Sequence, residues 1–132
     1  AAPINVQWGL DNRTVGLRVP DSGRESRRVE NRVPGADANP YLAIAASLAC
    51  GLLGMQQKLD PSAPVTASAY DMPYELPRSL EQSLQALENS DDLKEMLGTR
   101  FVQAWNAVKE SEYDTFLQVI SSWEREHLLL NV

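Results

Sequence analysis

The sequence predicts an α+β fold, with antiparallel strands over about residues 4–33 followed by a mostly helical part over about residues 38–127. Two observations support this class. Before residue 34, short β-branched and apolar stretches are separated by turn residues, which is typical of strands. After residue 36, apolar side chains recur at helical spacing behind helix-start signals. At 132 residues, the chain has the size of a single domain.

The strand region contains three expected strands. Apolar residues alternate over residues 4–8, and turn residues at 9–12 end that stretch. A second strand is expected over residues 14–19, where Pro20 stops it, and a third over residues 27–33. A polar loop joins the last two, so we expect them to pair in the antiparallel sense.

The first helix is expected to start with Asn39 as its N-cap and Pro40 at its first position. Residues 41–55 carry no charged side chain, and a helix that is apolar all round is expected to be buried. Cys50 lies in this run, so we expect an inert, buried thiol. The run is about 15 residues long, too short to span a bilayer, and no membrane partner is expected.

Loop and helix signals then organise the rest of the chain. Residues 58–78 contain four prolines and predict a loop that wraps rather than a domain boundary. Ser79 and Gln82 form a predicted capping box, and a short helix is expected over residues 91–97. Residues 101–123 predict one long amphipathic helix whose aromatic stripe belongs to the core.

The charge of the chain is unevenly distributed. Its net charge of −6 argues against nucleic acid as a principal partner. Residues 1–35 nevertheless carry six arginines, no lysine and four acids. Arginine suits planar, bidentate recognition of phosphate or carboxylate, whereas a solvated, salt-bridged hairpin is the alternative reading of the same pattern.

Single occurrences of cysteine and histidine limit the chemistry. Cys50 is alone, so an intramolecular disulfide is excluded and a reducing, cytoplasmic setting is expected. His127 is the only histidine, which excludes a multi-histidine metal site within the chain. The sequence begins at Ala1 without methionine and enters strand-like alternation almost at once, so we expect a piece of a longer protein.

One motif places a carboxylate between two guanidinium groups. Arg28, Glu30 and Arg32 alternate, so in an extended strand they share one face about 13 Å long. Such a face can hold a cation beside polyanionic groups. One carboxylate cannot bind Mg²⁺ well alone, so further ligands are expected from outside residues 1–132.

Two more arginines precede this motif. Arg13 and Arg18 are five residues apart and therefore point to opposite faces of a regular strand. If both serve one site, Gly16 is expected to mark a bulge that re-aims one of them. Several guanidinium groups around a carboxylate suit phosphoryl transfer, in which cations neutralise charge on phosphate oxygens.

Four segments together resemble, in order and spacing, the C-terminal part of the glutamine synthetase family. They are residues 8–13, 17–20, 28–35 and 38–43. Within that family, the sequences of residues 34–40 and 123–126 resemble those of the γ-glutamylputrescine (polyamine) synthetases.

The resemblance implies ATP-dependent amide formation, with phosphorylation of glutamate followed by attack of an amine. It assigns Glu30 to Mg²⁺ or Mn²⁺. It assigns Arg18 and Arg28 to the ATP phosphates, and Arg32 to the glutamate side chain and the transferred phosphate. Arg13 is placed between ATP and glutamate, so Arg13 and Arg32 are the implied catalytic residues.

The same resemblance implies that other metal ligands and the glutamate-binding loop lie upstream, so the chain alone is expected to be inactive. Family members assemble as rings, and residues 128–130 suit either an assembly contact or packing on the same subunit. Tyr70 resembles a regulatory tyrosine, but an ordinary loop tyrosine is the better reading. An ammonia-using glutamine synthetase and a catalytically silent assembly or binding relative are the alternatives to a polyamine ligase.

Overall fold

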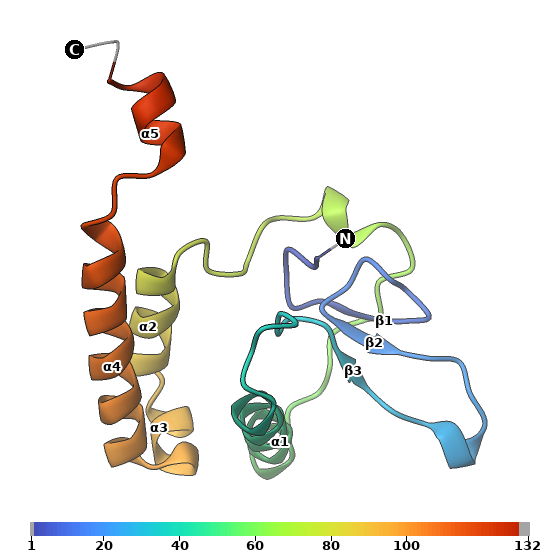
Figure 1. Cartoon of the computed structure of the whole chain (residues 1–132). Coiled ribbons are helices and arrows are strands. Elements are labelled where there is room, and N and C mark those ends of the chain that lie inside the picture. The colour runs from blue at the N-terminus through green and yellow to red at the C-terminus, as the bar shows by residue number, and fades with distance from the viewer. Residues whose placement is uncertain (1, 130–132) are drawn as a thin grey trace. The chain divides into compact units, whose positions relative to one another are not determined.

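A computed structural model describes residues 2–129 and divides into two compact units, Ala1–Pro77 and Arg78–Val132. The first unit holds a three-stranded sheet and one long helix, whereas the second is helical (Figure 1). Its elements are β1 (Trp8–Leu10), β2 (Leu17–Val19), η1 (Arg24–Ser26), β3 (Glu30–Asn31), α1 (Pro40–Gln56) and η2 (Ala69–Asp71). The second unit contains α2 (Leu80–Glu88), α3 (Asp91–Leu97), α4 (Thr99–Leu117) and α5 (Ser122–His127). The α+β prediction is confirmed.

The sheet has the order β1-β2-β3. β2 and β3 are antiparallel, as predicted, with Arg18 opposite Glu30. β1 and β2 are parallel, which corrects the expectation of antiparallel strands throughout. Both strands are only three residues long, so residues 11–16 can carry the chain back about 10 Å without a crossover helix.

The strand expected over residues 4–8 is found at Trp8–Leu10, partly within the expected turn, and β2 and β3 are shorter than predicted. Another segment takes hydrogen bonds of the N-terminal stretch. The carbonyl of Ile4 accepts from the amides of Glu75 and Leu76, at 3.0 and 3.3 Å. The carbonyl of Trp8 accepts from the Val65 amide at 2.8 Å. Residues 58–78 therefore wrap back along the N-terminal segment, as predicted. The expectation that they contain no boundary is not met, since the two compact units divide between Pro77 and Arg78.

Polar side chains fix this loop in place. Asn5 is fully buried and donates to the carbonyl of Ala69 at 2.9 Å. Asn12 donates to the carbonyls of Val65 and Ala67, at 2.9 and 2.8 Å. A Cβ on Gly9 would lie 2.5 Å from the Val65 carbonyl oxygen, so only glycine permits this close approach.

Helix α1 begins as predicted but is not buried. The Asn39 side chain accepts from the amides of residues 41 and 42, at 3.0 and 3.3 Å. Ala49 is its buried residue, whereas Tyr41 is 84% and Leu48 is 68% exposed. Cys50 is also exposed, which corrects the expectation of a buried thiol. A sheet of two- and three-residue strands is too small to cover a helix of 17 residues.

The second unit begins with a capped helix. Ser79 accepts from the Gln82 amide at 3.1 Å, as a capping box requires. The Gln82 side chain accepts from the amide of Arg78 rather than that of Ser79, so the reciprocal half of the box is shifted by one residue. Helix α3 has the predicted bounds and ends at Gly98, whose φ is +92°.

The predicted long helix is interrupted. Between α4 and α5, Ser121 starts a new helix through a capping box with Glu124, at 2.7 and 3.1 Å. The aromatic stripe is not core, since Phe116 and Trp123 are 66% and 60% exposed. Instead, α4 turns Val102 and Asn106 inward and lies alongside α2 and α3 (Figure 1).

The remaining expectations concern the ends of the chain and the membrane. Leu130 lies outside the described residues, so the predicted contact of residues 128–130 stays a prediction. In the described part of the chain, no helix has both the length and the apolar character needed to cross a bilayer.

The helical core can be tested with two valines of α4. Val102 is 1% exposed, so Val102→Ala is expected to lower the free energy of unfolding by about 2 kcal/mol through lost burial and a cavity. Val108 is 55% exposed, and Val108→Ala is expected to change it by less than about 0.5 kcal/mol. Urea unfolding measures both. Equal losses would contradict the placement of the core.

Candidate functional site

Four charged residues meet at the β2–β3 pair, and we call them the charged cluster: Asp11, Arg18, Arg28 and Glu30. The antiparallel register places Arg18 opposite Glu30. Arg18 donates from Nη1 to Glu30 Oε2 at 2.7 Å and from Nη2 to Asp11 Oδ1 at 2.6 Å. Its side chain is 16% exposed, so this arginine is held between two carboxylates in a partly desolvated position.

Arg28 completes the charged cluster from the other side of Glu30. It donates from Nε and Nη2 to Glu30 Oε1, at 3.1 and 2.9 Å, and from Nη1 to the Ser26 carbonyl at 3.2 Å. Both oxygens of Glu30 therefore accept from guanidinium groups. The prediction that Arg28 and Glu30 act together is consistent with this arrangement.

The two arginines determine the acidity of Glu30. The hydrogen bond from Arg18 lowers the pKa of this carboxyl group most, and the bonds from Arg28 lower it further. Partial burial opposes the shift. In return, the hydrogen bond to Glu30 raises the pKa of Arg18, so the pair is charged across the physiological range.

Arg32 does not join Arg28 on Glu30. Its Nη1 donates to the carbonyl of Val15 at 3.0 Å and to that of Arg13, so its guanidinium lies against the loop before β2. Of the three alternating side chains that were expected to share one face, only Arg28 and Glu30 contact each other, because backbone carbonyls of the loop before β2 take the Arg32 guanidinium.

Arg13 and Arg18 are not brought together by a bulge at Gly16. The Arg32 amide donates to the Gly16 carbonyl at 2.8 Å, which continues the regular register of β2 and β3. A Cβ at Gly16 would lie 2.5 Å from the Asn5 carbonyl oxygen. Glycine is needed here for a close backbone approach, and the bulge prediction is wrong.

Asp11 is the member of the charged cluster that the sequence did not indicate. It follows β1 directly, with φ of +48°, and its amide donates to the Val19 carbonyl at 3.0 Å. The parallel pairing of β1 and β2 brings it beside Arg18. An acidic residue within an arginine-rich segment could have indicated an ion pair, but the adjacent Asn12 made a turn the favoured prediction.

The residues present do not form a complete metal site. Among residues 2–129, no three side chains of the histidine, cysteine, aspartate and glutamate types are grouped to hold a metal ion. Glu30 can contribute one oxygen ligand, in competition with the guanidinium groups that it already accepts from.

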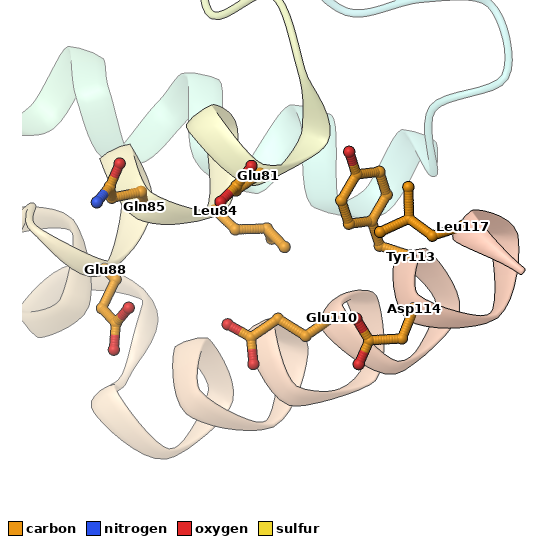
Figure 2. Close-up of a pocket in the computed structure, with 8 residues that line it drawn as sticks. All are labelled: Glu81, Leu84, Gln85, Glu88, Glu110, Tyr113, Asp114 and Leu117. Atoms are coloured by element: carbon orange, nitrogen blue, oxygen red, sulfur yellow. The ribbon is translucent and has the colours of Figure 1, made fainter.

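The second unit has a groove of a different character. Figure 2 shows carboxylates from the facing helices α2 and α4 along it. The cavity has a volume of about 440 Å³ and is lined by Glu81, Leu84, Gln85, Glu88, Glu110, Tyr113, Asp114 and Leu117. Four carboxylates repel a polyphosphate, so this groove is a poorer nucleotide site than the charged cluster.

Comparison with known proteins places the chain in a family. The family model described as "Glutamine synthetase, catalytic domain" matches residues 1–128. The chain belongs to the glutamine synthetase family. It is 41% identical to type-1 glutamine synthetase 2 of Dictyostelium discoideum, a match that covers 97% of this chain and 26% of that protein.

Other members of the glutamine synthetase family act on different amines by name. The chain is 40% identical to glutamate–isopropylamine ligase of Pseudomonas sp. and 40% identical to γ-glutamylethanolamide synthetase GlnA4 of Streptomyces coelicolor. These matches cover 91% and 93% of this chain and 27% of each relative. The chain thus spans about a quarter of the length of these curated relatives. By name, these relatives are synthetases or ligases.

Solved structures of GmaS share the fold. The apo form superposes with a TM-score of 0.83 and the ADP complex with 0.85. Both are 34% identical, and both matches cover 97% of this chain and 30% of GmaS. The predicted family and fold are confirmed, whereas the relatives include glutamine synthetases as well as amine ligases, so they do not select the polyamine subgroup.

The charge state of Glu30 gives a test by acid titration. A carboxyl group whose pKa is lowered by folding stabilises the fold above its ordinary pKa of 4.5, and this contribution is lost as pH falls through the folded-state value. Glu30→Gln is therefore expected to lower the melting temperature at pH 7 and to lower it less at about pH 3.

Glu25→Gln is the matched control, because Glu25 is an exposed acid of the same arginine-rich segment. Thermal unfolding across pH measures both variants. A deficit of Glu30→Gln that stays constant down to pH 3 would contradict the ion pairs of the charged cluster.

Proposed function

We propose that this chain forms the C-terminal part of an ATP-dependent γ-glutamyl-amine ligase. The reaction joins glutamate and an amine and converts ATP to ADP and phosphate. The charged cluster carries this proposal, because two guanidinium groups within 3 Å of one carboxylate give fixed cationic donors beside a potential metal ligand. The family membership of the chain supports the same chemistry.

Arg18 and Arg28, together with Arg13, are the proposed ATP-binding residues. Each terminal nitrogen carries two hydrogens, so the bonds to Glu30 leave donors that can point at phosphate oxygens. Arg18 is held on two sides and Arg28 is 54% exposed, which gives one ordered and one more accessible guanidinium. Such donors stabilise negative charge as it moves onto the phosphoryl oxygens.

Arg13 and Arg32 are the proposed catalytic and glutamate-binding residues. In the first step, an oxygen of the glutamate γ-carboxylate bonds to the terminal phosphorus of ATP and ADP leaves. In the second step, the amine nitrogen bonds to the acyl carbon, phosphate leaves, and the nitrogen loses a proton. The bonds from Arg32 to the carbonyls of Val15 and Arg13 support a role for it beside the Arg13 loop.

Glu30 is the proposed metal-binding residue, as one ligand to Mg²⁺ or Mn²⁺. A bound cation would neutralise charge on the phosphates. The other ligands are proposed to come from outside residues 1–132, and for that reason the chain alone is expected to be inactive. We further propose a cytoplasmic, ring-forming homo-oligomer for the full-length enzyme; the exposed apolar face of α1 is consistent with burial there.

Putrescine or another polyamine is the proposed amine. Residues 34–40 and 123–126 support this choice, and the amine ligases among the relatives are compatible with it. The alternatives are ammonia and a catalytically silent role in assembly or binding. The chain has Arg13, Arg18, Arg28, Glu30 and Arg32, all five residues to which the family resemblance assigns a role, and their presence disfavours a silent role.

The amine can be identified by assay of the full-length enzyme with glutamate and ATP. Phosphate release is expected with putrescine at a higher kcat/KM than with ammonia, and mass spectrometry should detect the γ-glutamyl amide. A preference for ammonia would support the second candidate, and no turnover with any amine would support the silent relative. Amide synthesis by residues 1–132 alone would contradict the requirement for upstream ligands.

The metal role of Glu30 can be tested in the same enzyme. Glu30→Gln is expected to abolish metal-dependent turnover, because the amide is a weaker ligand for a hard cation. Assembly, measured by light scattering, is expected to stay intact. Glu25→Gln serves as the control and should keep normal turnover, while full activity of Glu30→Gln would exclude the metal role.

A further inference from the structure

Asp11 contacts three residues in and just after β2. Its Oδ1 lies 2.6 Å from Arg18 Nη2, and its Oδ2 accepts from the Asp21 amide at 3.1 Å. Its own amide donates to the Val19 carbonyl at 3.0 Å. A residue with φ of +48° is thus tied to the β2 segment by backbone and side chain, which limits where its carboxylate can lie.

The carboxylate restricts a long and otherwise flexible side chain. Arginine has many rotamers in solution and loses most of that freedom when its guanidinium is held. Glu30 takes Nη1 of Arg18 at 2.7 Å, and Asp11 takes Nη2 from the opposite side. With both terminal nitrogens bonded, rotation about the last bonds of Arg18 would break a charge-assisted hydrogen bond.

The two carboxylates are not equivalent. Glu30 divides its oxygens between Arg18 and Arg28, whereas Asp11 gives its second oxygen to a backbone amide. Any ligand that binds the Glu30 carboxylate and displaces it weakens the hydrogen bond between Glu30 and Arg18. The bond from Asp11 does not depend on Glu30, because it comes from the loop after β1.

We propose that Asp11 is a positioning residue for Arg18: it keeps the guanidinium in place for ATP phosphates independently of Glu30. This inference rests on the proposed function. It assigns to Asp11 a role through Arg18 rather than a contact with the substrate.

Electrostatics makes the proposal distinguishable from a simple charge effect. Asp11 and Glu30 balance Arg18 and Arg28, so the charged cluster is neutral. Removal of the Asp11 charge makes the charged cluster more positive, which by itself favours a polyphosphate. Loss of positioning acts in the opposite direction, so the sign of the change separates the two effects.

The first experiment uses the 132-residue chain and needs no activity. Asp11→Asn keeps the size of the side chain and tolerates positive φ, and its folding is checked by circular dichroism. Nitrogen-15 relaxation of the Arg18 Nε–H group is expected to show a clear loss of order in Asp11→Asn. Asp21→Asn removes the same charge from an exposed neighbour and is expected to leave that order unchanged. Equal order in all three proteins would overturn the proposal.

The second experiment uses the full-length enzyme. Asp11→Asn is expected to lower kcat/KM for ATP about fivefold, the equivalent of one weakened hydrogen bond, whereas Asp21→Asn should keep it. Asp11→Glu restores the charge and should recover part of the loss. Unchanged or increased kcat/KM in Asp11→Asn would overturn the proposal even if the proposed reaction is observed. Absence of the reaction would refute the proposed function, while the relaxation data would still decide whether Asp11 orders Arg18.

Discussion

The ion pair between Arg18 and Glu30 forms only in the observed register of β2 against β3. These residues face each other across the strands, and a slip by one residue would turn them to opposite sides of the sheet. Gly16 protects the register, since any side chain there would collide with the backbone of Asn5. Because Glu30 also accepts from Arg28, the position of one carboxylate determines that of two guanidinium groups.

Neutrality distinguishes the charged cluster from a generic basic patch. The second unit carries a surplus of acids and presents four of them along one groove, which disfavours phosphate there (Figure 2). In the charged cluster of the first unit, Arg18 and Arg28 are paired with carboxylates yet keep spare hydrogen-bond donors. Such a site selects a ligand by the geometry of its donors more than by net charge, which suits the proposed phosphoryl transfer.

Local signals predicted most of the helix boundaries and the β2–β3 pair. Asn39, Ser79 and Gly98 act on the neighbouring turn of backbone, so their effect can be read from adjacent residues. The parallel partner of β2 and the bond from Asp11 to Arg18 depend on how a loop returns, which the spacing of residues does not specify. The prediction that residues 41–55 are buried was wrong. An apolar helix favours burial of its surface, but its sequence does not show which part of the protein packs against it.

The wrapping loop also has a consequence for how the chain folds. The hydrogen bonds from Asn5 and Asn12 join residues separated by 64 and 53 positions, so a long stretch of chain must close before either bond forms. In the second unit, α2, α3 and α4 are neighbours in sequence and can associate through short connections. Contacts of low sequence separation form fastest. The helical unit is therefore expected to fold first, and the sheet that carries the charged cluster is expected to close last.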